Sequence, residues 1–306
     1  MKILLTGGSG MVGKNVFEHL SKNTTYILFK PSRLELDLLK YDQVLRFLKR
    51  NKIESIIHCA GLVGGIQANI LRPYSFLVEN IEMGLNLVQA AIELKIPKLI
   101  NLGSSCMYPK NITESISEEQ ILTGKLEPTN EGYALAKIII AKMCEYSNRQ
   151  FLSNYKTIVP CNLYGKYDSF EPEKSHMIPA AIRKIVLAKK NQDKVEIWGD
   201  GTVRREFMYV EDLADFIVFA LKNYSKIESL TNVGLGYDFS ILDYYKKICE
   251  VIGYNAKFRF NINKPVGMRR KLCSVSKIES LGWKASHSLE EGLQKTYKYY
   301  EENYKI

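Results

Sequence analysis

Tyr133 and Lys137 are the residues of this sequence whose types and spacing most clearly predict catalysis. They stand four positions apart in a stretch of helical periodicity, so both side chains would lie on one helix face. Reduction of a ketone requires a proton for the oxygen, and a tyrosine beside a cation can donate it because the cation stabilises the phenolate left behind. A Tyr and a Lys at this spacing are common, but an upstream pair, Ser104 and Ser105, makes the combination more specific.

A glycine-rich segment near the N-terminus predicts a dinucleotide site. Its key glycines are Gly7, Gly10 and Gly13, and they stand between an apolar run of strand length and a helical segment. Such glycines permit a tight turn, let the backbone approach a pyrophosphate, and place that anion at a helix N-terminus. The alternative, a glycine turn without a ligand, is weakened by this strand, turn and helix context.

The end of the second expected strand indicates which dinucleotide binds. Enzymes that prefer NAD usually carry an acid there for the ribose 2′-hydroxyl, whereas NADP enzymes place cations against the 2′-phosphate. The sequence reads Phe29-Lys30-Pro31-Ser32-Arg33, with no acid at that point. Ser32 and Arg33 are therefore the expected phosphate ligands, with Lys30 assisting, and a solvated basic turn is the alternative.

The elements that must position these groups follow an alternating pattern, which predicts an α/β fold with a Rossmann-like, doubly wound parallel sheet. The expected strands are Lys2 to Thr6, Tyr26 to Phe29, Ser55 to Cys59, Lys98 to Leu102 and Thr157 to Pro160. The expected helices cover residues 11–21, 40–51, 73–95 and 132–150.

After about residue 165 the alternation loosens. Short strands are expected near Glu196 and Thr231, and helices near 176–190, 211–223, 240–252 and 288–303. Because no Gly/Ser-rich or Pro-rich linker intervenes, these segments should form a smaller C-terminal α/β lobe packed against the sheet. We therefore expect residues 1–165 mainly to bind NADP and residues 166–306 mainly to bind substrate, with chain crossings between the lobes and a ligand cleft where they meet.

Composition excludes several classes of protein. The 306 residues are 46% hydrophobic and 25% charged, which is typical of a globular protein. The net charge of +10 suits ligands that carry phosphates, but Lys and Arg are spread along the chain, so nucleic-acid binding is not expected. Six cysteines without a C-x-x-C pair predict neither disulfides nor a metal site. Without a signal peptide or a long apolar run, the expected location is the cytoplasm, away from membranes.

Taken together, these features resemble the extended short-chain dehydrogenase/reductases, whose Ser, Tyr and Lys correspond to Ser104, Tyr133 and Lys137. Longer stretches extend the resemblance over essentially the whole chain to the GDP-L-fucose synthase family. They are Val63 to Ile66, Leu102 to Pro109, Glu127 to Asn130, Asn162 to Gly165, Ser175 to Pro179, Trp198-Gly199, Arg205 to Phe207 and Arg270 to Leu272.

The resemblance implies an NADP(H)-dependent enzyme that reduces a GDP-linked 4-keto-6-deoxy sugar after epimerisation at C3 and C5. It also implies that Cys106 and His176 are the acid and base of the epimerisation. A 4-keto group acidifies the hydrogens on both neighbouring carbons, and a thiol (pKa about 8.5) and an imidazole (pKa about 6.5) can exchange protons near neutral pH. Dehydration is disfavoured, because related dehydratases carry an acid at the position of Cys106. A 4-epimerase would not be expected to carry both Cys106 and His176.

The resemblance implies the remaining binding residues as well. Further contacts to the cofactor are expected from Met11, Val12, Ala60 and Leu62. Contacts to the GDP-sugar are expected from Asn162, Lys184, Trp198, Arg205 and Lys271. Cations suit a pyrophosphate and an indole can pack on a ligand, with plain core packing the alternative for Trp198. The helices at 73–95 and 132–150 would pair with their copies in a homodimer, the alternative being that their apolar faces are wholly internal.

Two departures from the family pattern leave the sugar open. The segment Gly165-Lys-Tyr-Asp-Ser-Phe170 replaces Gly-Pro-His-Asp-Asn-Phe near the sugar pocket, and Ser274 replaces an Asp. A GDP-4-keto heptose, as used by similar capsule-pathway reductases, is therefore an alternative substrate, in which case the chain would perform reduction alone. Alternatives of other classes are a non-catalytic NADP-binding sensor or scaffold, which would not need a proton donor, and an RNA-binding protein.

Overall fold

The alternation of apolar runs with helical segments produces a parallel sheet in the computed structural model, which describes residues 1–172 and 174–304. Six strands lie in the order β10-β5-β4-β3-β1-β2, and each neighbouring pair is parallel. Their bounds are β1 Lys2–Thr6, β2 Ile27–Phe29, β3 Ser55–His58, β4 Lys98–Leu102, β5 Tyr155–Pro160 and β10 Leu230–Val233. The expected Rossmann-like sheet is thereby confirmed.

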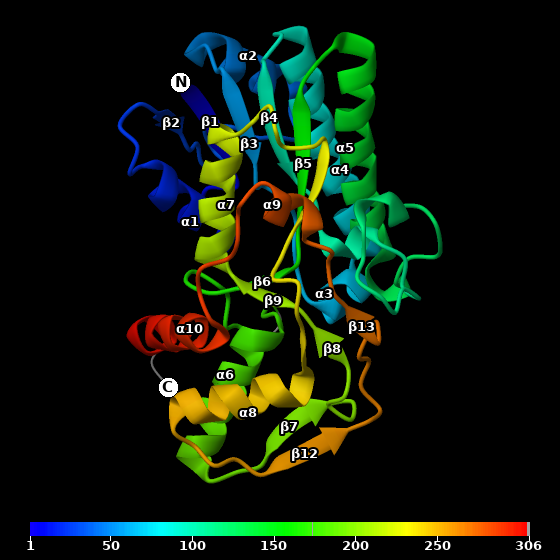
Figure 1. The fold of residues 1–306 in the computed structure, drawn as a ribbon. Coiled ribbons are helices and arrows are strands. Elements are labelled where there is room, and N and C mark those ends of the chain that lie inside the picture. Colours follow the sequence, from blue (N-terminus) through cyan, green and yellow to red (C-terminus); the bar gives the residue numbers. More distant parts are fainter. Residues whose placement is uncertain (173, 305–306) are drawn as a thin grey trace.

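Helices cover both faces of this sheet (Figure 1). On one face, Ile3 and Leu5 pack into a core shared with α1 (Met11–Leu20), α7 (Val210–Lys222) and α9 (Ser276–Ser280). On the other face, Leu4 packs into a core shared with α2 (Tyr41–Asn51), α4 (Pro73–Glu93) and α5 (Glu131–Phe151). Successive strand residues point to opposite faces, so a run of apolar residues is what a doubly covered strand requires.

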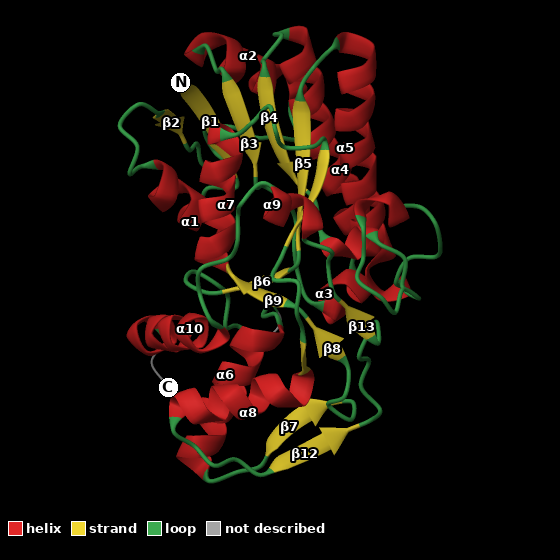
Figure 2. Cartoon of the chain, in the orientation of Figure 1, coloured by secondary structure: helices red, strands yellow, loops and turns green. Residues whose placement is uncertain are grey.

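The rest of the chain forms a second lobe beyond the carboxyl ends of the strands (Figure 2). Its core is built from α6 (Met177–Asn191), α8 (Ile241–Ile252) and α10 (Leu289–Asn303). Three small sheets pair β6 with β9, β7 with β12, and β8 with both β11 and β13. The bounds are β6 Asn162–Tyr164, β7 Val195–Trp198, β8 Arg204–Arg205, β9 Phe207–Tyr209, β11 Phe239–Ser240, β12 Phe258–Asn261 and β13 Arg270–Lys271, with α3 at Ile66–Leu71. In the part of the chain that the structure describes, no helix is long and apolar enough to cross a membrane.

A buried carboxylate ties these segments together where the lobes meet. Glu206, between β8 and β9, is fully buried and accepts hydrogen bonds from the backbone N–H groups of Leu235, Gly236 (2.9 Å) and Cys273 (2.8 Å). A Cβ at Gly234 would lie 2.4 Å from a Glu206 oxygen, so glycine is required there. One side chain thus joins the loop after β10 to the segment after β13, the strand that ends at Lys271.

Replacement of Glu206 by glutamine should destabilise the protein. The amide NH2 cannot accept the N–H bonds that the carboxylate oxygens accept, and hydrogen bonds to a charged group contribute about 1.5–3 kcal/mol each. We expect Glu206→Gln to lower the free energy of unfolding by about 2 kcal/mol or more in urea titrations. Glu302→Gln, at an exposed position on α10, is the control and should change it by less than about 0.5 kcal/mol. Equal effects would show that the three bonds do not join the lobes.

Candidate active site

A cavity of about 690 Å³ lies between the two lobes and is lined by residues from the sheet's carboxyl edge and from the second lobe. Its walls are supplied by the segments after β3 and β4, by α5, and from the second lobe by the start of α6 and by β8 and β13. Because parallel strands all end at one edge, a ligand placed there meets residues from distant parts of the chain.

The glycine turn between β1 and α1 has the geometry that the sequence predicts. Gly7 has φ +68° and its carbonyl accepts the Gly10 N–H at 3.0 Å. A Cβ at Gly7 would meet the Ala60 backbone nitrogen at 2.5 Å, and one at Gly13 would meet the Gly7 oxygen at 2.1 Å. Gly10 is the N-cap of α1 and carries no side chain to cover the first-turn N–H groups, so these can receive a pyrophosphate.

The neighbouring residues that the sequence predicts to contact the cofactor lie in or next to segments that line the cavity. Met11 and Val12 line the cavity directly. Ala60 and Leu62 alternate with Cys59, Gly61 and Val63, which line it. Asn80 of α4 fixes this segment, because its side chain accepts the Leu62 N–H at 2.9 Å and donates to the Leu62 carbonyl at 3.1 Å.

Ser32 and Arg33 lie exposed in the turn after β2, outside the set of residues that line the cavity. The stem of Lys30 packs over Gly8, where a Cβ would lie 2.0 Å from it, and its ammonium sits 4.1 Å from the Phe17 ring centroid. Sequence reasoning missed an acid here. The Glu35 carboxylate folds back to accept the Ser32 N–H at 2.7 Å, which lowers the pKa of Glu35. The Glu35 carboxylate therefore caps the Ser32 backbone N–H of this basic turn.

Ser104, Tyr133 and Lys137 converge on the cavity. Tyr133 and Lys137 share one face of α5, with the ammonium 5.8 Å from the Tyr133 ring centroid. Burial first, and then the charge of Cys106, raises the pKa of Tyr133, while a hydrogen bond with Ser104 opposes the rise. The hydroxyl is thus held protonated, as a proton donor must be before it reacts.

Lys137 is a buried cation at the sheet edge. Its ammonium donates to the Leu102 carbonyl at 2.8 Å, a neutral acceptor, and burial lowers the pKa of Lys137 to about 8. Burial and this charge together lower the pKa of His58 to about 3, so His58 is a neutral partner of the Thr6 hydroxyl. A lysine held this way is ready to bind a polar ligand group and to stabilise a phenolate.

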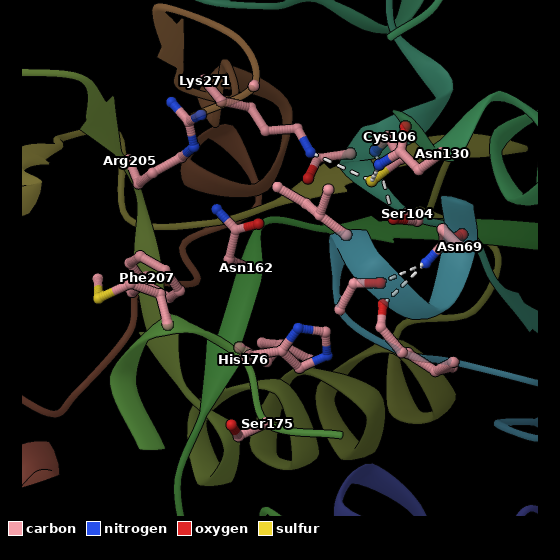
Figure 3. A pocket seen from close by; sticks show the side chains of 18 of the residues that line it. Asn69, Ser104, Cys106, Asn130, Asn162, Ser175, His176, Arg205, Phe207 and Lys271 are labelled. Atoms are coloured by element: carbon pink, nitrogen blue, oxygen red, sulfur yellow. Dashed lines mark hydrogen bonds between the residues drawn. The ribbon is translucent and has the colours of Figure 1, made fainter. Parts of the chain in front are cut away.

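Cys106 and His176 face the same cavity from different elements (Figure 3). Cys106 lies in the short 3-10 helix Ser105–Met107 after β4, and His176 is the N-cap of α6. Burial and the charge of Lys271 lower the pKa of His176, so its imidazole is neutral. Burial acts to raise the pKa of Cys106, yet Lys271, Ser104 and Asn130 outweigh it and lower the pKa.

The five residues expected to hold the GDP-sugar also line the cavity. Lys184 donates to the Glu196 carbonyl at 3.2 Å, and its ammonium lies 5.4 Å from the Trp198 ring centroid. The indole is not simply core, because the ammonium of Lys264 also lies 5.3 Å from its centroid. Arg205 donates to the Val266 carbonyl at 2.8 Å. Lysines beside a half-buried indole suit a diphosphate joined to a ring.

Two further residues expected to bind the substrate also have protein partners. Asn162 donates to the Glu206 carbonyl at 2.8 Å, and Lys271 donates to the Cys106 sulfur at 3.3 Å. Asn130, to which sequence reasoning gave no role, donates to the same sulfur at 3.2 Å. The only sequence signal for Asn130 was its place in the Glu127 to Asn130 motif.

A glycine turn at the first strand of a parallel sheet, with Tyr, Lys and Ser at its carboxyl edge, defines a nucleotide-dependent oxidoreductase fold of the short-chain type. The model of the NAD dependent epimerase/dehydratase family matches residues 3–236. The chain belongs to that family.

Particular relatives narrow the comparison. The chain is 54% identical over 302 residues to a GDP-L-colitose synthase of Yersinia pseudotuberculosis, covering 98% of each chain. It is 45% identical over 300 residues to a GDP-L-fucose synthase of Azorhizobium caulinodans, covering 98% of this chain and 96% of that one. A solved GDP-mannoheptose C4 reductase from Campylobacter jejuni with NADP bound superposes with a TM-score of 0.87 at 33% identity, covering 98% of both chains.

Removal of the Arg33 guanidinium should weaken NADPH binding selectively. NADPH and NADH differ only in the 2′-phosphate, which a guanidinium can bind through two hydrogen bonds. We expect Arg33→Ala to raise the Kd for NADPH by about tenfold or more, equivalent to about 1.4 kcal/mol, and to leave the Kd for NADH nearly unchanged. Titration of nicotinamide fluorescence measures both constants. A parallel loss of affinity for both cofactors would place the 2′-phosphate elsewhere.

Proposed function

We propose that this protein uses NADPH to reduce the 4-keto group of a GDP-linked 4-keto sugar. The observation that carries the proposal is the convergence of Ser104, Tyr133 and Lys137 on the cavity that begins at the glycine turn. The relatives support the nucleotide and the reaction, because the solved C4 reductase holds NADP and acts on a GDP-linked sugar. The glycine turn, the open N-terminus of α1 and the basic turn after β2 fit that cofactor.

In this proposal the reducing half of the reaction belongs to α5. NADPH, when bound, supplies hydride to the carbonyl carbon. Tyr133 donates its hydroxyl proton to the carbonyl oxygen of the sugar. Ser104 forms hydrogen bonds with the Tyr133 oxygen and with that carbonyl oxygen. The buried Lys137 stabilises the phenolate that remains on Tyr133. Domain roles follow: residues 1–165 mainly bind the cofactor and residues 166–306 mainly bind the GDP-sugar.

We propose that Cys106 and His176 invert carbons beside the keto group before reduction. A thiol and an imidazole on different walls of one cavity can remove and return a proton at a carbon that the 4-keto group acidifies (Figure 3). Similarity to the colitose and fucose synthases favours a 6-deoxy sugar. In a 3,6-dideoxy sugar such as colitose, C3 bears no hydroxyl, so inversion there would have no meaning and only C5 would be inverted.

A second candidate is reduction of a GDP-4-keto heptose without inversion. It is favoured by the likeness to the GDP-mannoheptose C4 reductase and by the altered segment Gly165 to Phe170. Location in the cytoplasm, where NADPH and nucleotide sugars are made, and a role in capsule polysaccharide supply are further parts of the proposal.

Tyr133→Phe should separate the two chemistries. The variant lacks the proton donor, so NADPH oxidation with a GDP-4-keto sugar should fall by about a hundredfold or more. Deuterium uptake from heavy water at C5, followed by NMR without NADPH, should persist because it depends on Cys106. Cys106→Ser should show the opposite pattern: NADPH oxidation should persist and deuterium uptake at C5 should be lost.

The substrate is identified by offering the 6-deoxy, 3,6-dideoxy and heptose GDP-4-keto sugars to the unaltered enzyme and determining product configuration. Reduction of the heptose alone, without deuterium uptake, would replace the first candidate by the second. Full-rate reduction by Tyr133→Phe would contradict the assignment of the proton donor.

We propose further that α4 and α5 pair with their copies in a homodimer. The two helices pack against each other and leave apolar side chains exposed, with Tyr74 at 74%, Ile139 at 38% and Tyr146 at 54% exposure. Exposed apolar residues gathered on adjacent helices are typical of an interface.

A charge on that surface should dissociate the dimer. We expect Ile139→Glu to halve the mass measured by light scattering after gel filtration. Ile262→Glu, at a position 76% exposed in the second lobe, is the control and should leave the mass unchanged. A monomeric unaltered protein would refute the proposal.

A further inference from the structure

The sulfur of Cys106 is surrounded by donors. The Lys271 ammonium lies 3.3 Å from it and the Asn130 amide nitrogen 3.2 Å from it (Figure 3). An ammonium has three N–H donors and no acceptor, and an amide NH2 is likewise a donor. The sulfur must therefore accept from both, which a thiolate does far better than a thiol. Nothing in the proposed reduction requires this arrangement.

The pairing of two short strands, β8 and β13, places Lys271 beside the sulfur. In β8 and β13, Arg204 lies beside Arg270 and Arg205 beside Lys271. Adjacent strand residues point to opposite faces, so Arg205 and Lys271 enter the cavity while the other pair points away. On that far side, the two arginines donate to opposite oxygens of Asp238, each at 2.6 Å.

Asp238 is consequently a clamp: it holds β8 and β13 together without hydrogen-bonding to Cys106 or Lys271 itself. Its side chain is only 1% exposed although its arginine partners reach the surface. Arg204 also donates to the Asp238 carbonyl at 2.6 Å, which fixes the backbone of the following strand, β11. The carboxylate holds β8 and β13 in register, and the register decides where the Lys271 ammonium lies.

The other charged and titratable groups around Cys106 do not replace Lys271. The charge of Cys106 acts to raise the pKa of Arg205 in β8. The Arg205 guanidinium, however, donates to the Arg204 and Val266 carbonyls. The charge of Glu127 likewise acts to raise the pKa of Arg205. Tyr133 of α5 is held protonated. His176 of α6 is neutral, because burial and Lys271 lower its pKa.

We infer that Cys106 rests as a thiolate with Lys271 as its counter-ion and Asn130 as a second donor, and that Asp238 is the positioning residue that keeps Lys271 in place. The inference rests on the proposed inversion at the same site. It moves Lys271 from the diphosphate, where sequence similarity had placed it, to the reacting carbon.

The arrangement has a chemical consequence. When the thiolate removes a proton from the carbon beside the keto group, the C–H bond breaks, an S–H bond forms, and the electron pair moves into the enolate of the sugar. Net charge is unchanged, and the negative charge passes from sulfur to sugar beside a cation that is already in place. A preplaced charge of this kind lowers the barrier because nothing must reorganise during the step.

The ionisation of Cys106 can be measured without substrate or NADPH. The protein is alkylated with iodoacetamide from pH 5 to 10, and the modified peptides are quantified by mass spectrometry. We expect the Cys106 rate to reach its plateau with a midpoint at least one pH unit below about 8.5, the ordinary value for a thiol. Cys59 lines the same cavity and burial raises its pKa to about 12, so it is an internal control that should stay unmodified at neutral pH.

Four variants test the partners. Lys271→Met should raise the Cys106 midpoint by one pH unit or more, with about a tenfold slower rate at pH 7, and Lys271→Arg should restore most of the shift. Asn130→Ala should raise the midpoint less. Lys184→Met removes a cavity cation that contacts Glu196 and Trp198 instead, and should leave the midpoint in place.

Asp238→Asn separates positioning from simple electrostatics. Loss of a negative charge by itself would favour the thiolate and lower the Cys106 midpoint, whereas loss of the clamp displaces Lys271 and raises it. We expect a rise. A midpoint at or above about 8.5 in the unaltered protein, or no change in Lys271→Met, would overturn the inference. Either result can be told from failure of the proposed function, in which the thiol titrates as expected but no GDP-4-keto sugar is reduced.

Discussion

The register of the parallel sheet is the constraint on which the rest of the site depends. Thr6, His58 and Asn101 lie side by side in β1, β3 and β4, so these three strands end at one level. The glycine turn, the segment through Cys59 and the segment through Ser104 therefore leave the sheet together. A slip of one residue in any strand would reverse which side chains face each helical layer and would expose part of the core. Burial of the sheet on both faces thus fixes the active site as well as the fold.

Two cysteines at this edge have pKa values shifted in opposite directions, although each has a lysine beside it that acts to lower its pKa. Lys137 lies near Cys59, yet burial raises the pKa of that thiol to about 12 and the lysine only partly offsets it. Lys271 lies near Cys106 and, with Ser104 and Asn130, lowers the pKa of an equally enclosed thiol. At Cys106 the charge of Lys271 acts together with direct hydrogen bonds to the sulfur, whereas Lys137 donates to the Leu102 carbonyl. A neighbouring positive charge does not lower the pKa of a thiol below its ordinary value when burial opposes it and the donor bonds elsewhere.

The sequence predicted the parts of this protein that obey local rules. The five strands of the first half and the long helices follow apolar periodicity, and the structure places them within a few residues of the predicted bounds. The glycine turn and the Tyr133 and Lys137 pair were predictable because each carries its chemistry within a few positions. The short α3 and α9 and the strands β8, β11 and β13 were missed, because two to six residues are too few to show a period.

The site was less predictable for a related reason. Glu35, two positions beyond Arg33, was overlooked because its carboxylate folds back on the turn, which only the backbone geometry reveals. Arg204 and Arg270 come from two strands and Asp238 from the loop before a third, and nothing in their separate sequence surroundings indicates that they meet. The contact of Lys271 with Cys106 joins positions 165 apart. Family resemblance supplied both residues but not the contact, and so it gave Lys271 a different partner.

The contact between Lys271 and Cys106 also indicates which of Cys106 and His176 acts as the base and which as the acid. A positive charge near a thiol and an imidazole favours the anionic form of the first and the neutral form of the second, and Lys271 lowers the pKa of both Cys106 and His176. The resting pair is then thiolate and imidazole rather than thiol and imidazolium. Cys106 is the stronger candidate for the first proton removal, because it needs no prior ionisation. His176 would begin as a neutral N–H donor, which suits a hydrogen bond to the growing enolate oxygen or to a water that reprotonates the carbon.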